Sequence, residues 1–195
     1  RKHSRFRERL NMLSGIAMKK HRGSRDLWVF AYVLLVFISI AFWEAYMEGE
    51  HGGASMQVGW DANLWGWRLN AYHFWLWWVT VPAFLCLPLV VESQLNVHLF
   101  GVLLASYYVG TIIEDFSWFV INPYWGLSKF TSRAVTWNDW ITLGYTEIPR
   151  FYVTNLLAAT LSWAIFVKNE SLIQRAIGEV ATRLRLRSSR ETHEG

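Results

Sequence analysis

The sequence predicts an all-α integral membrane protein with four transmembrane helices. Of its 195 residues, 53% are hydrophobic and 13 are tryptophan. Four long apolar stretches account for this composition, and each approaches the roughly 20 residues that a helix needs to cross a bilayer. None of them alternates between apolar and polar residues as the strands of a membrane barrel do. Because helices satisfy their own backbone hydrogen bonds in lipid, we expect a four-helix bundle.

The apolar stretches set the bounds of the expected helices. Pro82 and Pro88 fall inside the second stretch, where each removes a backbone donor and favours a kink. The third helix should end before Pro123, because the residue before a proline avoids helical geometry. At the start of the first helix, Ser24 and Asp26 are the candidate capping residues. The four expected spans are residues 27–46, 71–91, 97–122 and 151–167.

The distribution of basic residues predicts the orientation. Residues 1–26 contain nine Lys and Arg and residues 168–195 contain six, whereas the long connections 47–70 and 123–150 share four. The excess of positive charge on cytoplasmic segments then places both termini in the cytoplasm. We expect a basic cytoplasmic segment over 1–26, a membrane domain over 27–168 and a basic cytoplasmic tail over 169–195.

The basic termini favour a membrane surface over nucleic acid as the partner. In the tail, Ile173, Ile177, Val180 and Leu184 recur at helical spacing and predict an amphipathic helix on the inner surface. Anionic headgroups would attract its arginines, and a docking helix for a partner protein is the alternative. The expected location is a bacterial or archaeal cytoplasmic membrane. The Arg-rich start leaves an organellar inner membrane as the other choice.

The third connection predicts a short additional helix. Thr136-Trp137-Asn138-Asp139 has the pattern of a capping box, with Thr136 accepting from the first turn. Trp137, Trp140 and Ile141 would then share one side of a helix. We expect this helix to lie flat on the outer interface.

Ionisable residues gather toward one side of the predicted bundle. Glu114 and Asp115 lie near the outer end of the third span, and groups at such a depth commonly mark functional sites. Glu44 ends the first span and His73 begins the second, so three helices contribute at similar height. Adjacent helical residues point about 100° apart. We therefore expect one of Glu114 and Asp115 to face the site and the other to be a structural acceptor.

These residues predict a metal-binding or acid–base site. Glu48-x-x-His51 has the spacing that aligns two ligands in di-iron bundles, and Glu44 lies one turn before it. A mixed shell of imidazole and carboxylate suits Zn, Fe or Mn. For proton transfer, the candidate catalytic residues are Glu114, Asp115 and His73. The candidate metal ligands are Glu44, Glu48, His51, His73 and Glu114.

A network of structural hydrogen bonds is the alternative interpretation of the same residues. Glu114 or Asp115 would then pair with Arg150, and His73 would be an interfacial residue. His98, near the start of the third span, is expected to contact lipid headgroups.

Taken together, the patterns predict a small membrane protein with a metal-binding or proton-handling site near the outer leaflet. Eleven of the 13 tryptophans fall in the outward half and would form a cap over it. The alternative function is a non-catalytic accessory subunit of a larger respiratory or photosynthetic membrane complex. A transporter fits less well, because the polar groups stop at one depth instead of reaching the midplane. The sequence leaves open whether the protein is an enzyme.

Overall fold

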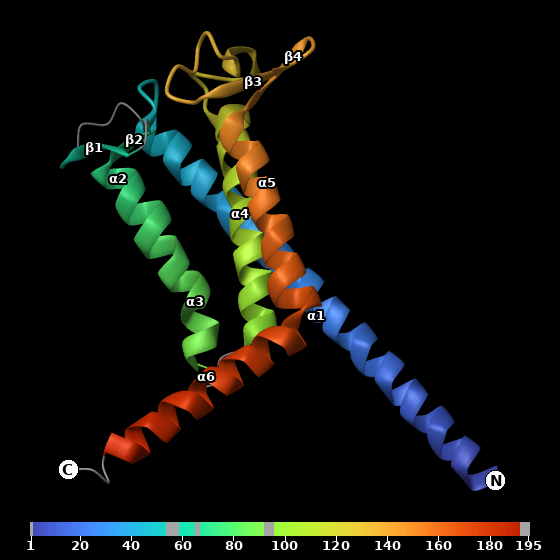
Figure 1. Cartoon of the computed structure of the whole chain (residues 1–195). Coiled ribbons are helices and arrows are strands. Elements are labelled where there is room, and N and C mark those ends of the chain that lie inside the picture. Colours follow the sequence, from blue (N-terminus) through green and yellow to red (C-terminus); the bar gives the residue numbers. More distant parts are fainter. Residues whose placement is uncertain (1, 54–58, 65–66, 92–95, 192–195) are drawn as a thin grey trace.

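A computed structural model describes residues 2–53, 59–64, 67–91 and 96–191 of the chain (Figure 1). Helices dominate, and two short hairpins connect them. The elements are α1 (Lys2–Glu48), β1 (Asp61–Leu64), β2 (Trp67–Asn70), α2 (Ala71–His73), η2 (Phe74–Thr80), α3 (Val81–Val91), α4 (Val97–Ile121), η3 (Leu127–Lys129), β3 (Trp140–Leu143), β4 (Thr146–Pro149), α5 (Arg150–Ser162), η4 (Trp163–Lys168) and α6 (Glu170–Glu191).

Four helical segments in the described part of the chain are long and apolar enough to cross a membrane, as the sequence predicts. They are Arg22–Glu48, Ala71–Val91, Val97–Ile121 and Arg150–Lys168. Figure 1 shows both strand pairs at one end of these helices, and we call this the hairpin end. At the opposite end, which we call the tail end, α6 and the N-terminal part of α1 extend away from the bundle.

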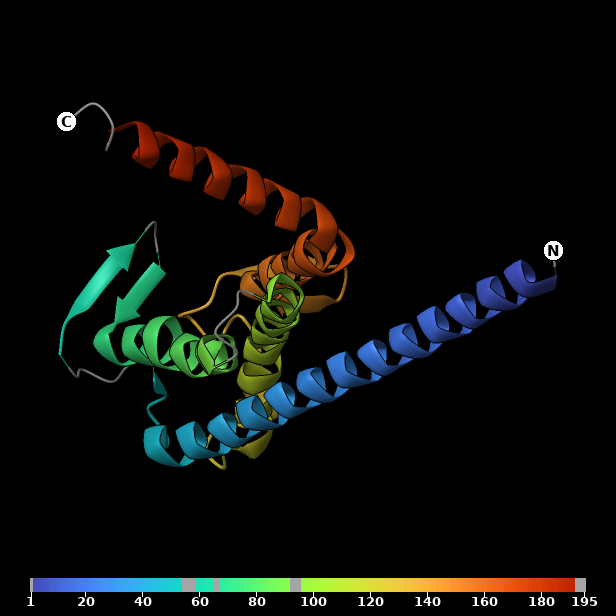
Figure 2. The ribbon, with the colours of Figure 1, turned by 90° about the horizontal axis from the view of Figure 1, so that it is seen from below.

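Helix α4 is the centre of the bundle and lies between α1 and α5 (Figure 2). It packs closely on α1, where Gly110 faces the ring of the fully buried Phe37. A Cβ atom at Gly110 would lie 2.5 Å from the Phe37 ring. Gly101 plays the same role against Phe166, near the end of the fourth span. Small residues at such crossings let helix backbones approach closely in lipid.

The second span combines α2, η2 and α3 into one continuous but irregular helix. Its middle segment, Phe74–Thr80, has π-helical hydrogen bonding, in which Val81 N–H donates to the Leu76 carbonyl. Pro82 follows directly and has no N–H to offer, so a wider turn is a reasonable adjustment. The hydroxyl of Tyr107 on α4 donates to the Trp77 carbonyl at 2.6 Å and ties this irregular segment to the bundle.

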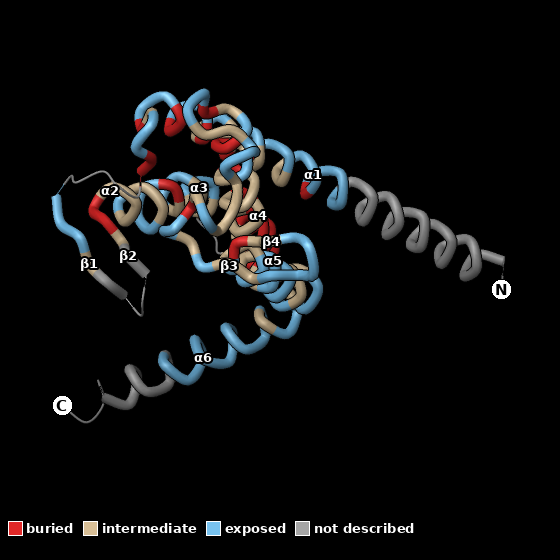
Figure 3. The backbone as a smooth tube through the Cα atoms, turned by 90° about the horizontal axis from the view of Figure 1, so that it is seen from above, coloured by how far each residue is buried: buried red, intermediate tan, exposed pale blue. Residues whose placement is uncertain are grey.

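This second span packs less tightly than α4 does (Figure 3). Trp75, Trp78 and Phe84 are 56%, 63% and 72% exposed, so the described chain covers little of these side chains. A membrane or a partner would cover these apolar surfaces.

The first helix differs from the prediction at its start. Helix α1 runs without interruption from Lys2 to Glu48, so Ser24 and Asp26 lie inside a helix and do not cap one. At its other end, Gly49 adopts a φ of 58°. Glycine adopts this left-handed conformation at little cost and commonly terminates helices in this way. The helix therefore ends before His51.

The predicted helix at Thr136 is wrong. Residues 136–138 form turns, and the chain then enters the antiparallel pair β3–β4, with Trp140 opposite Pro149. Gly144, with a φ of 61°, makes the hairpin turn, while the Trp140 indole donates to the Val135 carbonyl at 2.9 Å. Alternating Ile141 and Leu143 suit a strand better than a helix. The capping pattern at Thr136 therefore does not start a helix, because the residues that follow pair as a β-hairpin.

The β3–β4 hairpin is fastened to the preceding loop by one carboxylate. Glu147 accepts hydrogen bonds from the backbone N–H and the hydroxyl of Ser132, both at 2.9 Å. These bonds favour the ionised carboxylate and lower the pKa of Glu147. The attachment is therefore fully formed above the ordinary pKa range of glutamate and is lost as the pH falls through the lowered value.

The close approach of α1 and α4 leads to the first prediction. The substitution Gly110→Ala should destabilise the protein by about 1–3 kcal/mol, because the new methyl group meets the Phe37 ring in a packed interface. Thermal unfolding in detergent measures this effect. Gly178→Ala on α6 is the matched control, since nothing lies within 4 Å of its Cβ position, and it should not lower stability. Equal melting temperatures for the two variants would contradict the proposed contact.

Candidate functional site

Three ionisable side chains converge at the hairpin end of the bundle. Glu44 and Glu48 come from the last turns of α1, and His73 comes from α2. One ligand atom from each of the three lies within 4.8 Å of the other two. Both carboxyl groups are buried, and the imidazole is half-buried. The structure thus brings together residues that are up to 29 positions apart in the sequence.

The end of α1 shapes one wall of this cluster. Glu44 and Glu48 are four residues apart, so they share one face of the helix. After Gly49 the chain turns back, and Gly53 packs directly against both Glu48 and His73. A Cβ atom at position 53 would collide with the Glu48 carboxylate and lie 2.8 Å from His73 Nε2. The backbone N–H of Gly53 also donates to Glu48. A side chain at position 53 would therefore require Glu48 or His73 to move.

Asn70 positions the imidazole side of the cluster. Its side-chain oxygen caps the second span by accepting from the His73 N–H at 2.9 Å. Its amide nitrogen donates to the Gly53 carbonyl at 2.8 Å. Asn70 is only 2% exposed, so it holds the turn after α1 and the first turn of α2 in one arrangement.

Glu114 extends the cluster onto α4. Its carboxyl group is buried and is hydrogen-bonded to the carboxyl group of Glu44. The hydroxyl of Tyr72 donates to Glu44 Oε1 at 2.7 Å from the other side. Two carboxyl groups in contact need a shared proton or a cation, because like charges at this distance repel.

Asp115 faces a different neighbour from Glu114. It accepts a hydrogen bond of 2.7 Å from the hydroxyl of Tyr152 on α5. One turn nearer the tail end, Asn155 donates to Thr111 at 2.8 Å and ties the same two helices together. The adjacent acids therefore serve two interfaces, Glu114 toward α1 and Asp115 toward α5.

Two other candidates lie apart from the cluster. The side chain of His51 is 78% exposed, and its Nε2 lies 3.6 Å from Glu50 Oε1. Because α1 ends at Glu48, the Glu48-x-x-His51 spacing does not place both residues on one helical face. Arg150 lies 3.8 Å from Asp139 in the loop at the hairpin end, so its ion pair is not with Glu114 or Asp115.

The four acids of this layer lack a lysine or arginine partner among the described side chains, and the basic side chain beside them is His73. Among the described side chains, arginines form ion pairs with other acids, Arg22 with Glu170 and Arg150 with Asp139. Burying a charged carboxylate without compensation costs several kcal/mol. A cation or bound protons must therefore balance Glu44, Glu48, Glu114 and Asp115.

Several supporting residues were not predicted from the sequence. Asn70 and Tyr72 flank the predicted His73, and an asparagine just before an apolar run is a recognisable capping signal. No local pattern indicates Gly53 or Trp118. The Trp118 indole nitrogen is buried and lies near the Glu48 carboxyl group, although the two do not meet in normal hydrogen-bond geometry.

Comparison with known protein families, curated proteins and solved structures finds no match to this chain. The site is therefore described by its own chemistry. Two carboxylates and one imidazole are a donor set suited to Zn, Fe or Mn. Three protein ligands would leave further coordination positions open, as in catalytic metal sites.

The contact of Gly53 with the cluster leads to the second prediction. The substitution Gly53→Ala should displace Glu48 or His73, and the cost of this crowding should be about 1–3 kcal/mol. The nitrogen chemical shifts of the His73 ring report the displacement, and thermal unfolding reports the cost. Gly23→Ala is the control, because its Cβ position is open. Unchanged His73 shifts in Gly53→Ala would show that the turn does not shape the cluster.

Proposed function

We propose that this chain is an integral membrane protein that binds a divalent transition-metal ion at the hairpin end of its bundle. The observation that carries the proposal is the mutual approach of Glu44, Glu48 and His73 within 4.8 Å in a buried layer. The absence of a lysine or arginine partner among the described side chains adds to it. A divalent cation would compensate the charge that burial otherwise penalises.

Each residue of the layer has a distinct role in this proposal. Glu44, Glu48 and His73 supply the ligands. Tyr72 and Glu114 hold Glu44 through hydrogen bonds, and such outer contacts orient ligands and adjust affinity. Asn70 and Gly53 hold the backbone on which His73 and Glu48 depend.

The same layer suits proton handling. A metal ion lowers the pKa of a bound water, which then requires a proton acceptor. Glu114 touches the ligand Glu44 and could pass a proton along that contact. Asp115 and Tyr152 form a separate pair toward α5, which we assign a structural role.

Orientation and location extend the proposal. The basic residues of the tail end favour a cytoplasmic position for both termini, which would place the metal site near the outer leaflet. The bilayer is then the first partner, in a bacterial or archaeal cytoplasmic membrane.

The second candidate function is that of an accessory subunit in a larger membrane complex. The observation in its favour is the loosely packed second span, with Trp75, Trp78 and Phe84 exposed. Purification in a mild detergent distinguishes the two cases. A stable complex with larger chains supports the subunit, and a stable isolated chain that retains metal supports the independent protein.

Metal retention is the third prediction. Purified protein equilibrated separately with Zn, Mn or Fe and then dialysed should retain about one ion per chain by elemental analysis. Glu48→Gln and His73→Asn should each weaken binding by at least about tenfold, because each removes a donor from the cluster.

The control for this experiment is another histidine. His51→Asn removes an imidazole that lies outside the cluster, so this variant should retain the ion. The proposal fails if the native protein retains no metal, or if His51→Asn loses it as fully as His73→Asn does.

Orientation gives the fourth prediction. In a Cys86→Ala background, Tyr145→Cys at the tip of the β3–β4 hairpin should react with a membrane-impermeant maleimide on intact cells. Thr182→Cys on α6 should react only after the cells are permeabilised. The reverse pattern would place the metal site on the cytoplasmic side.

A further inference from the structure

Helix α6 begins where the fourth span ends. The apolar segment Arg150–Lys168 is followed by the single residue Asn169, with φ −108° and ψ 25°, and α6 starts at Glu170. Figure 1 shows α6 turning away from the direction of α5 and running across the tail end. With one residue between them, α6 must start at the surface where the span leaves the hydrocarbon.

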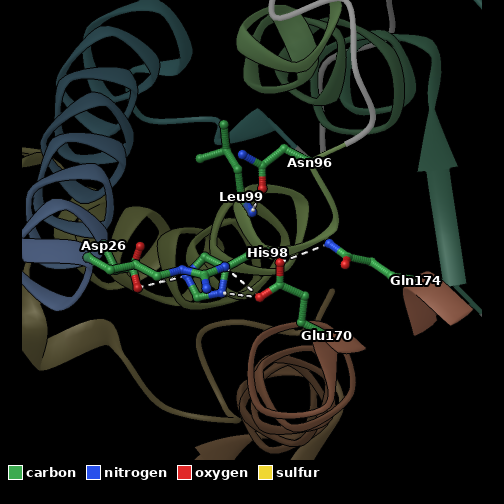
Figure 4. A network of polar contacts seen from close by, with 7 residues as sticks. Asp26, Asn96, His98, Leu99, Glu170 and Gln174 are labelled. Atoms are coloured by element: carbon green, nitrogen blue, oxygen red, sulfur yellow. Dashed lines mark hydrogen bonds and ion pairs between the residues drawn. The ribbon is translucent and has the colours of Figure 1, made fainter. Parts of the chain in front are cut away.

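A polar cluster at the tail end, with His98 and Asp26 buried at its centre, holds the first turn of α6. His98 Nε2 lies 2.8 Å from Asp26 Oδ2, and His98 Nδ1 lies 3.6 Å from Glu170 Oε2 (Figure 4). Arg22 donates to the same Glu170 oxygen, and Gln174 donates to the other at 3.0 Å. We call Arg22, Asp26, His98 and Glu170 the His98 clasp. It joins α1, α4 and α6.

The prediction that His98 contacts lipid headgroups is wrong, because His98 belongs to the clasp. His98 is only 5% exposed and lies between two carboxylates. Its Nδ1 has no hydrogen-bond partner of normal geometry among the described residues. His98 therefore links Asp26 on α1 to Glu170 on α6 through its two ring nitrogens.

The clasp decides which side of α6 faces the bundle. Glu170 contacts α1 and α4, and Ile173 beside it is half-buried. At about 100° per residue, Ile177, Val180 and Leu184 share this face. Their side chains are 43%, 57% and 62% exposed, so the described chain leaves them largely uncovered. An exposed apolar stripe therefore continues along α6 on the face that is turned toward the membrane spans.

The charge of α6 indicates what lies beside this stripe. Residues 171–190 contain five arginines and a single acid, Glu179. Arg175 and Arg183 are exposed and lie off the stripe. An apolar stripe flanked by arginines matches the boundary between acyl chains and anionic headgroups.

We propose that α6 binds the anionic leaflet at the tail end, with Ile177, Val180 and Leu184 in the acyl boundary and its arginines on lipid phosphates. The His98 clasp sets the rotation of α6, and thereby turns the stripe toward the lipid. This surface is separate from the metal site at the hairpin end.

Hydrogen exchange of the full chain in nanodiscs tests lipid binding. In nanodiscs of phosphatidylcholine with phosphatidylglycerol, the amides of residues 174–184 should exchange at about one tenth of their rate in phosphatidylcholine alone, or more slowly still. Arg175→Gln with Arg183→Gln should remove most of this difference, whereas Glu179→Gln should preserve it. Equal exchange in both lipids overturns the proposal. So does protection that tracks a dimer in both lipids, since α6 would then bind a second copy.

The role of the clasp is tested separately. Glu170→Gln keeps the shape of the side chain but weakens its contacts with Arg22 and His98, so the anionic-lipid protection of α6 should fall. Glu179→Gln makes the same charge change on the same helix outside the clasp and serves as the control. A second clasp variant is Asp26→Asn, which should lower the same protection. If this variant unfolds the bundle, Glu170→Gln still decides the question, because α6 lies at the edge of the bundle. Undiminished protection in Glu170→Gln would refute the positioning role.

Discussion

The rest of the structure depends on the parallel contact between α1 and α4. Its closest point is the packing of Gly110 against Phe37, which lets the two backbones approach. The pairing stays in register along the whole span. Asp26 meets His98 at the tail end, Glu44 meets Glu114 toward the hairpin end, and Asn122 donates to the Gly49 carbonyl beyond it at 2.9 Å. The contacts of Asp26 with His98 and of Glu44 with Glu114 both depend on the closeness of this helix pair. A larger residue at position 110 would disturb them together.

The two ends of the bundle treat buried acids differently. At the tail end, Asp26 and Glu170 lie against His98 and Arg22, so each acid has a partner within the chain. At the hairpin end, the acids have tyrosine hydroxyls, one another and His73, and no lysine or arginine partner among the described side chains. Burial of charge is tolerated only with compensation. The acids at the tail end have their partners within the chain. The acids at the hairpin end need a cation or protons from solution, which is why we propose the metal site there.

Much of the architecture was predictable, because lipid imposes strong rules on composition. Four apolar segments predicted four spans, and the observed bounds differ mainly where α1 continues through the basic segment. Predictions outside the apolar segments were weaker. The capping pattern at Thr136 predicted a helix, but the chain forms β3–β4, because a capping box is a local signal and strand pairing is not. His51 was separated from Glu48 by a glycine turn that ended the helix early.

The sequence by itself determined four apolar helical segments and their approximate ends, and helical rise then gives the relative height of each polar group along its helix. It also determined that Glu114 and Asp115 must point to different neighbours. Only the tertiary structure decided which neighbours these are. Rotation of each helix about its axis is set by packing between helices, here by Phe37 against Gly110, and this rotation turns Glu114 toward Glu44 and Asp115 toward Tyr152. Periodicity fixes angles within one helix, but not the angle at which that helix meets another.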